Sequence, residues 1–566
     1  MTMVITERNF DESGVSFDVV VDGKPQTDSE GQEKRLTVAE LDELDNVTIA
    51  REDPQEGNDP DTWKDDRKIT YKITFEGDGA YRIQPYVTDT TGNASDSITG
   101  KSFYIDTTAP TISVDYNDKD LSLNNGKYFN SSRVMNITYT ERNFSEDLLT
   151  FDVTIDGTPY ENITLEKLRE YGNQADITVG ELKDDQSEVG DAGEYTNERK
   201  NTLEITFGAD GKDHDYKITP KIKDLAGNQN IGITDGDGTK VSTGEDFTVD
   251  QVIPTVSVDY YLVDEEQGGD DLDEKIDISS EEAINKATRL YKNKTIRAEV
   301  KITERNFGSD QEIFSTSQID PNFTWIQNDG TDGDVTGFTE AARKVSEWTT
   351  DPDNSDVRVQ TFDFILEGDY IFGMQYTDLA GNEAVDANNT SSIGYSEHYF
   401  TVDKTAPKIN VVYKVNGQKI EPGTGEGERL FETDTITAEV TIDERNFFRE
   451  DEQTQFEQGQ MDLIYTAKNF DGNNVTVDDY RGKANTRAGW EKVDDGSSPY
   501  VRRQIFTFSE DANYTLKLDY TDLAGNKAVD SSDESIGHAM RYFTVDREAP
   551  TEISLSMEPS FRTFVI

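Results

Sequence analysis

Three kinds of acidic residue recur at fixed places in this 566-residue sequence, and carboxylates of this kind bind hard cations. A glutamate opens four copies of Glu-Arg-Asn-Phe, at 7–10, 141–144, 304–307 and 444–447. An aspartate opens four turns that end in Gly-Asn, at 89–93, 224–228, 378–382 and 522–526. Another aspartate stands four residues before a proline, at 106–110, 250–254, 403–407 and 546–550. Because Ca²⁺ prefers oxygen ligands, cation binding is the first chemistry to consider.

The overall composition excludes several classes of function. The chain has 115 acidic against 55 basic residues, a net charge of -60, which argues against nucleic-acid binding and against docking on anionic membranes. It has no cysteine, so it has no disulfide or thiolate site, and its three histidines lie far apart in sequence. No nucleophile, metalloprotease or phosphate-loop motif is present, so we expect no enzymatic activity. No signal peptide, membrane-spanning run or sorting signal is visible.

The motifs return in the same order each time, which indicates whole domains in tandem. Successive glutamates of Glu-Arg-Asn-Phe are separated by 134, 163 and 140 residues. The prolines mark the boundaries because proline cannot pair within a sheet. The predicted domains are 1–106 (lacking its first strand), 107–250, 251–403 and 404–546, with 547–566 beginning a further, incomplete repeat.

Alternating apolar residues predict β-strands that bury one face. Tyr514, Leu516, Leu518 and Tyr520 form such a row and end at an aspartate, and a second kind of row ends at the glutamate of Glu-Arg-Asn-Phe. A first strand follows each proline, as at 111–116. Short helices are predicted at 165–171 and 338–348.

These motifs resemble the bacterial Ig-like domain repeats of large cell-surface adhesins. A strand that runs into Asp-Leu-Ala-Gly-Asn, followed by Phe-Thr-Val-Asp-x-x-Ala-Pro, is similar to the end of one such domain and the start of the next. The resemblance implies an all-β protein of tandem Ig-like β-sandwiches in an elongated beads-on-a-string array. The stretch 511–514 is also similar to the tyrosine corner of such sandwiches.

In an Ig-like sandwich the second and the next-to-last strands end at the same pole, whereas the last strand ends at the opposite pole and faces the next domain. Three acids should therefore meet at each joint between domains. The predicted metal sets are Asp106, Glu141 and Asp224; Asp250, Glu304 and Asp378; and Asp403, Glu444 and Asp522. Adhesins of this kind often carry Ca²⁺ at domain joints, so the resemblance implies Ca²⁺ here.

A purely structural role for the same acids remains open. Each aspartate can accept hydrogen bonds from its own turn. Each glutamate has an adjacent arginine, namely Arg142, Arg305 or Arg445. The recurring aromatic residues Trp63, Tyr195, Trp348 and Trp490 are expected to pack against the edge of a core.

The most direct functional hypothesis is a non-catalytic stalk or adhesive region of a bacterial surface or secreted protein. It would be extracellular, attached to the cell surface or cell wall, and a monomeric rod. One alternative is direct binding of a host or neighbouring-cell ligand, either a glycan or a protein such as an immunoglobulin. Another is an accessory region of a large extracellular carbohydrate-active or cell-wall enzyme.

Overall fold

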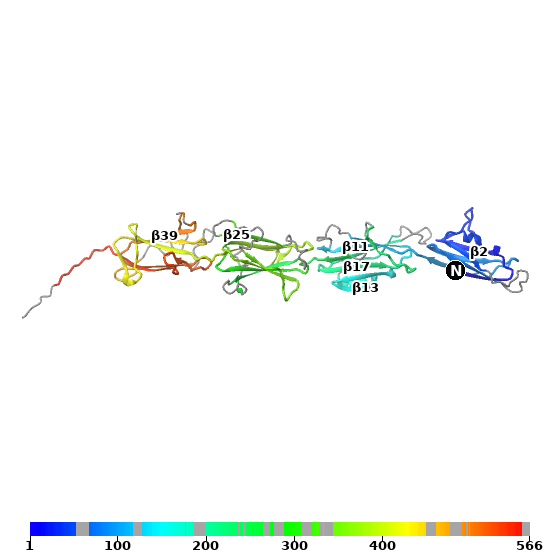
Figure 1. Cartoon of the computed structure of the whole chain (residues 1–566), viewed down its shortest axis with the longest axis horizontal. Coiled ribbons are helices and arrows are strands. Elements are labelled where there is room, and N and C mark those ends of the chain that lie inside the picture. The colour runs from blue at the N-terminus through cyan, green and yellow to red at the C-terminus, as the bar shows by residue number, and fades with distance from the viewer. Residues whose placement is uncertain are drawn as a thin grey trace, which may run out of the picture. The chain divides into compact units, whose positions relative to one another are not determined.

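The structure is a computed structural model, and it describes most of the chain. The described residues are 1–52, 67–116, 127–175, 177–185, 199–235, 238–241, 245–263, 272–276, 288–307, 319–327, 332, 343–448, 460–475, 489–493, 496 and 498–556. The chain forms two compact units, one comprising Met1–Val252 with Leu379–Asn382 and the other Ile253–Asp378 with Glu383–Ile566. Nearly all of the regular secondary structure in both units is β-strand (Figure 1).

The first unit contains the strands of the first two sequence repeats. The first repeat has β1 (Thr2–Glu7), β2 (Val15–Val21), β3 (Lys24–Pro25), β4 (Leu36–Thr37), β5 (Val47–Glu52), β6 (Arg67–Phe75), β7 (Gly79–Val87) and β8 (Lys101–Ile105). The second has β9 (Thr111–Tyr116), β10 (Tyr128–Phe129), β11 (Arg133–Glu141), β12 (Leu149–Ile155), β13 (Thr158–Thr164), β14 (Ile177–Val179), β15 (Lys183–Asp185), β16 (Arg199–Phe207), β17 (His214–Ile222), β18 (Ile233–Asp235), β19 (Lys240–Val241) and β20 (Glu245–Val249).

The second unit contains the strands of the third and fourth repeats. The third repeat has β21 (Thr255–Val263), β22 (Leu272–Ile276), β23 (Leu290–Lys292), β24 (Thr295–Thr303), β25 (Ile319–Gln327), β26 (Arg343–Val345), β27 (Thr349–Thr350), β28 (Val357–Phe364), β29 (Gly368–Tyr376), β30 (Val385–Asp386), β31 (Asn389–Ile393) and β32 (Tyr395–Val402). The fourth has β33 (Lys408–Val415), β34 (Gln418–Ile420), β35 (Leu430–Glu432), β36 (Ile436–Asp443), β37 (Met461–Lys468), β38 (Glu491–Lys492), β39 (Val501–Phe508), β40 (Ala512–Tyr520), β41 (Val529–Asp530) and β42 (His538–Val545).

The strand order is that of an Ig-like sandwich. In the second repeat one sheet runs β14-β16-β11-β9-β18-β19 and the other runs β10-β20-β17-β12-β13. The first strand, β9, thus lies beside β11, the strand that ends at Glu141, while the last strand, β20, lies beside β17, the strand before the Gly-Asn turn, and β10 pairs with β20 in parallel. This division of strands between two sheets is the Ig arrangement. The all-β, Ig-like fold predicted from the sequence is confirmed.

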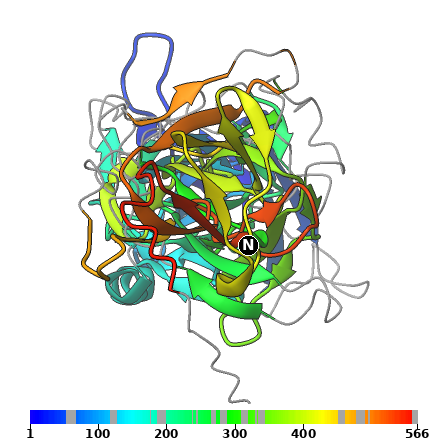
Figure 2. The same ribbon diagram turned by 90° about the vertical axis from the view of Figure 1, so that its left-hand side faces the viewer.

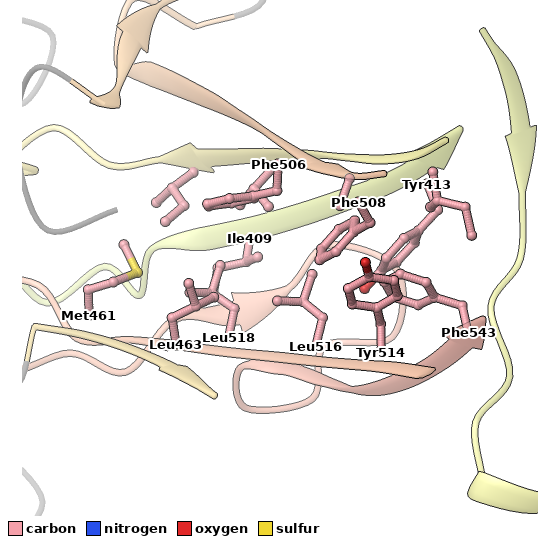
Figure 3. Close-up of a cluster of buried hydrophobic side chains, with 14 of the residues drawn as sticks. Ile409, Tyr413, Met461, Leu463, Phe506, Phe508, Tyr514, Leu516, Leu518 and Phe543 are labelled. Atoms are coloured by element: carbon pink, nitrogen blue, oxygen red, sulfur yellow. The ribbon is translucent and has the colours of Figure 1, made fainter. Parts of the chain in front are cut away.

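Each repeat encloses its own apolar cluster between its two sheets. In the fourth repeat, Ile409 and Phe506 from one sheet face Leu516 and Phe543 from the other, and all four are buried (Figure 3). The corresponding clusters of the first three repeats draw only on residues 3–83, 112–249 and 256–402. Separate cores of this size allow each repeat to fold around its own apolar contacts. The domain boundaries given above stay predictions.

The tyrosine corner predicted at 511–514 is present and recurs. The hydroxyl of Tyr514 donates to the carbonyl oxygen four residues earlier at 2.8 Å. Tyr81 and Tyr370 make the same bond, at 2.8 and 2.6 Å. Such a bond fixes the turn that leads into the next-to-last strand, whose far end carries the aspartate of the Gly-Asn turn.

The two predicted helices have different outcomes. The first forms as α2 (Leu165–Ala175), with Leu168 buried in the core, and it is visible as a coiled ribbon in Figure 2. The second prediction is wrong where it can be judged, because Arg343–Val345 forms β26 against β28, and 338–342 lies outside the described residues. There the pairing available at the sheet edge prevails over local helix propensity. A further short helix, α1, covers Val38–Asp42.

Candidate metal centres

One group of three carboxylates lies in the second unit. Asp403 follows the last strand of the third repeat, Glu444 follows β36, and Asp522 follows β40. Each offers a carboxylate oxygen within 4.8 Å of the other two, and the three side chains are 3%, 6% and 3% exposed. Strands from two successive repeats therefore converge on one small, nearly water-free space.

The first unit contains the equivalent group. Asp106 follows β8, Glu141 ends β11 and Asp224 follows β17. Their oxygens also lie within 4.8 Å of one another, and Glu141 and Asp224 are buried, whereas Asp106 is half-buried. The structure thus brings together, in both units, the residues whose convergence was predicted from strand direction.

The spacing of the oxygens fits a single hard cation. Ca²⁺ binds oxygen at about 2.3–2.6 Å, so two ligands on opposite sides of one ion lie about 4.6–5.2 Å apart. Oxygens that all lie within 4.8 Å of one another can therefore share one ion. The donor set contains only oxygen, which is the chemistry that Ca²⁺ selects and that softer transition metals do not.

Burial makes the cation-free form of these groups costly at neutral pH. Burial, reinforced by the charge of Asp403, raises the pKa of Glu444 from its usual value to about 9. Burial also raises the pKa of Asp403 to about 6 and raises that of Asp522. In the first unit, burial and the neighbouring acids raise the pKa of Glu141 to about 7. A bound divalent cation would offset the electrostatic repulsion between the carboxylates. Without a cation, uptake of a proton by one of them relieves that repulsion.

Two asparagines join each group across the boundary between repeats. In the second unit, Asn446 donates its side-chain amide to Asp403 Oδ2 (2.6 Å), and its backbone N–H donates to Glu444 Oε1 (2.5 Å). Asn526 donates to the carbonyl oxygen of Asp403 (2.7 Å) and to Asp522 Oδ2 (2.8 Å). These amides hold the three acids in place.

In the first unit the same contacts recur. Asn143 donates its side-chain amide to Asp106 Oδ2 (2.5 Å), and Asn228 donates to the carbonyl oxygen of Asp106 (2.9 Å). This role of the asparagines was not predicted from the sequence. Their presence in all four copies of both motifs was the signal that could have indicated it.

Two of the four arginines of Glu-Arg-Asn-Phe bind acids of the preceding repeat. Arg142 contacts Asp22 at 2.5 Å, and Arg445 contacts Asp369 at 2.6 Å. Successive strand residues point to opposite faces, so an arginine next to the glutamate is directed away from it. At Arg142 and Arg445, therefore, the arginine pairs with an acid of the preceding repeat and does not neutralise the adjacent glutamate.

A comparison of Asp89 with Asp522 distinguishes the effect of hydrogen bonds within the turn from the effect of burial. Asp89 accepts hydrogen bonds from the side-chain amide of Asn93 and from the backbone N–H groups of Asn93 (2.8 Å) and Thr91 (2.9 Å). Together these hydrogen bonds lower the pKa of Asp89 to about 2. Asp522 accepts the equivalent N–H of Asn526 at 2.8 Å, yet its pKa is raised. Turn capping is thus common to both copies, and burial of Asp522 reverses the direction of the pKa shift.

The remaining predicted set is divided between the two units. Asp250 belongs to the first unit, whereas Glu304 and Asp378 belong to the second. Glu304 accepts the backbone N–H of Asn306 at 2.5 Å, as Glu444 does from Asn446. A metal site formed by these three residues stays a prediction from the sequence.

The segment between aspartate and proline is itself held by hydrogen bonds. Asp78 accepts the backbone N–H of Thr107 (2.8 Å), and Glu367 accepts that of Lys404 (2.7 Å). Each of these acids lies in the turn before the next-to-last strand of the preceding repeat. The connecting segment is therefore an ordered part of the joint rather than a free linker.

Two of the recurring aromatic residues pack as expected. Trp348 lies 5.2 Å from the ring of Phe307, and the buried Trp490 lies 5.1 Å from that of Phe447. Both phenylalanines are buried, so the motif Glu-Arg-Asn-Phe serves the core and the joint together. Trp63 and Tyr195 lie outside the described residues.

Comparisons with known proteins give no family assignment. No protein-family model and no curated protein matches the sequence. Among solved structures, the chain is similar to invasin, a bacterial integrin-binding protein (10% identity, 96% of this chain and 79% of that chain, TM-score 0.24). It is also similar to the C-terminal domain of the Streptococcus pyogenes antigen I/II-family protein AspA (11% identity, 52% and 99%, TM-score 0.17). At these scores we draw the fold from the strand order alone.

Among the described residues, no helix has the length and apolar character needed to cross a membrane.

Proposed function

We propose that this chain is a non-catalytic, extracellular stalk whose successive Ig-like sandwiches are joined stiffly by Ca²⁺. The observation that carries the proposal is the group Asp403, Glu444 and Asp522, buried between elements of two successive repeats and matched by Asp106, Glu141 and Asp224. The sequence places a third set, Asp250, Glu304 and Asp378, at the corresponding point.

A cation bound at such a group would act on the relation between neighbouring domains rather than on either domain alone. Asp403 comes from the third repeat, whereas Glu444 and Asp522 come from the fourth. An ion that binds all three stabilises only those orientations in which both repeats present their ligands. Hydrogen bonds of Asn446 and Asn526 already favour that orientation of the two repeats. The ion would therefore further restrict the range of orientations that the two repeats adopt.

The chemistry of the site favours a mechanical over a catalytic role. Carboxylates that are nearly inaccessible to water leave no room for a substrate, and their hydrogen-bond partners include the side-chain amides of Asn446 and Asn526. A rod of this kind would hold a separate binding region away from the cell. A ligand on a host or neighbouring cell, bound by the repeats themselves, stays a prediction, as does a role beside an extracellular enzyme.

The test combines calorimetry with small-angle X-ray scattering of the whole chain. We expect Ca²⁺ to bind at the acid groups, raise the melting temperature and reduce the spread of interdomain distances relative to chelator. Mg²⁺ should act less, because it demands octahedral geometry and gives up its waters reluctantly. No Ca²⁺-dependent change in either melting or scattering would refute the calcium-stiffened stalk.

A further inference from the structure

One face of the first repeat carries two arginines that pair with no acid of the described residues. The face is the outward side of the sheet β3-β2-β7-β8, in which β4 also pairs with β2, whereas β1 belongs to the other sheet. Arg35 directly precedes β4 and Arg82 lies on β7, and both side chains are exposed. Within the described part of the chain, neither makes an ion pair. Both arginines are therefore available to a ligand, in a chain whose net charge is -60.

In later repeats, lysines on the corresponding face are paired with acids. Lys217 of β17 occupies the position of Arg82 in the strand register, and its ammonium lies 3.9 Å from the carboxylate of Asp246. The ammonium of Lys517, on β40, lies 2.5 Å from the carboxylate of Asp519. The side chain of Lys217 is 45% exposed, so exposure alone does not leave a cation on this face unpaired. The unpaired arginines thus distinguish the first repeat from these two.

Arg35 is held in place by an aromatic ring. Its Cζ atom lies 3.5 Å from the centre of the Tyr86 ring. A guanidinium that stacks on a ring contacts it through its flat face, whereas its N–H groups lie in its plane and can still donate two parallel hydrogen bonds to a carboxylate. Tyr86 and Arg82 lie four residues apart on β7, so the strand places their backbones about 13 Å apart. The two cations thus mark the ends of one strip of the sheet.

Short polar side chains occupy the strip between the two arginines. Ser16 lies opposite Tyr86 and Asp18 lies opposite Gln84, and all four alternate with residues that point into the core. Within the described residues, the side chains of Ser16, Asp18 and Gln84 make no hydrogen bond. A carboxylate accepts hydrogen bonds, and an amide both accepts and donates them. The strip therefore suits a ligand rich in hydroxyl groups, whereas the charge of Asp18 disfavours a polyphosphate or an acidic peptide.

We propose that this face of the first repeat binds a glycan that contains a sugar carboxylate. Arg35 binds the carboxylate, Asp18 and Gln84 bind ring hydroxyls, and Arg82 binds the far end of the oligosaccharide. Because the chain as a whole is strongly negative, a glycan with few carboxylates should bind more tightly than a densely charged one. The proposal goes beyond the stalk and does not rest on calcium binding, so either can fail without the other.

The test is isothermal titration of the whole chain with two acidic oligosaccharides. Sialyllactose carries its carboxylate on a terminal sugar, and a trimer of galacturonic acid carries one on every ring. Each is compared with its own derivative in which the carboxylate is reduced to an alcohol. We expect binding of sialyllactose, of the galacturonate trimer or of both, and binding at least about tenfold weaker after reduction, because a charge-assisted hydrogen bond is lost. If neither acid binds, or if reduction changes nothing, the proposal is wrong.

Substitutions locate the site. Arg35→Ala and Arg82→Ala should each weaken binding by about tenfold or more, and Arg35→Lys should restore little, because lysine lacks the planar fork of donors. The matched control Lys217→Ala removes an exposed cation from the equivalent position of the second repeat and should leave the affinity unchanged. All four variants should melt as the unaltered chain does, since none breaks a buried contact. Unchanged affinity in both Arg35→Ala and Arg82→Ala overturns the proposal.

Asp18→Ala distinguishes a glycan site from a simple anion site. If Asp18 accepts hydrogen bonds from sugar hydroxyls, its removal should weaken binding by about tenfold. If the arginines only attract negative charge, its removal should strengthen binding, because a repulsive carboxylate is gone. Stronger binding in this variant, or competition by polyglutamate at equal carboxylate concentration, therefore contradicts the proposal.

Discussion

Replacing Glu444 by glutamine tests the electrostatic argument for the acid group most directly. The substitution keeps the shape of the side chain and an oxygen for the N–H of Asn446, but it removes the titratable charge. Without a cation, the folded state retains a proton on Glu444 up to a pKa of about 9, whereas the unfolded chain loses it near 4.5. The free energy of unfolding is therefore highest below pH 4.5, and it falls as the pH rises from 4.5 to about 9.

The expected size follows from the pKa difference. Between the unfolded value and pH 7 lie about 2.5 pH units, which at 1.36 kcal/mol per unit correspond to about 3 kcal/mol. In chelator at pH 7, Glu444→Gln should therefore stabilise the fourth repeat by up to about 3 kcal/mol, or roughly 6–12 °C for a domain of this size. At about pH 3 the two proteins should melt alike, because the glutamate is then protonated in both states.

Calcium should offset much of this difference. At about 100 times its dissociation constant, an ion that binds only the folded state contributes about 2.7 kcal/mol to the unaltered protein. The variant lacks one charged ligand and should gain less. Because the chain holds several repeats, the readout is calorimetry combined with hydrogen exchange of 436–447 and 512–526.

Glu7→Gln is the matched control. Glu7 accepts the N–H of Asn9 at 2.7 Å, as Glu444 does from Asn446, but no acid of another repeat joins it in the described structure. We expect no calcium-dependent difference for this variant. If Glu444→Gln fails to stabilise the protein in chelator at pH 7, the argument from burial and repulsion is wrong. If calcium protects the variant as strongly as the unaltered chain, the ion binds elsewhere.

Three further substitutions test the joint and the fold. Asn446→Ala removes a donor to the buried Asp403 and should destabilise the joint by about 1–3 kcal/mol in chelator, measured as exchange of 436–447; unchanged exchange would show that the amide does not hold it. Tyr514→Phe loses the tyrosine-corner bond and should cost about 1 kcal/mol in urea unfolding, and no loss would mean that packing alone fixes the turn. Arg445→Ala leaves Asp369 paired with Arg289 and should cost about 1–3 kcal/mol while calcium affinity stays unchanged, because the contact of Arg445 is with Asp369; a large fall in affinity would place the arginine at the acid group.

The sequence was sufficient for the strands because burial in a sheet has a period of two. Tyr514, Leu516, Leu518 and Tyr520 were predicted to share a buried face, and all four are buried in the structure. The helix predicted at 338–348 is wrong because the structure there depends on pairing with distant residues and not on a local pattern. Its residues have local helical preference, but Arg343–Val345 pairs at the edge of a sheet that is formed by residues distant in sequence.

The sequence by itself also determined which acids could meet, since strand direction and chain order specify the pole at which each strand ends. It could not determine the environment in which they meet. The same turn holds Asp89, whose pKa is lowered, and Asp522, whose pKa is raised, and the two local sequences are nearly alike. Only the tertiary structure decides this difference, because the raised pKa of Asp522 comes from burial, which depends on elements distant in sequence.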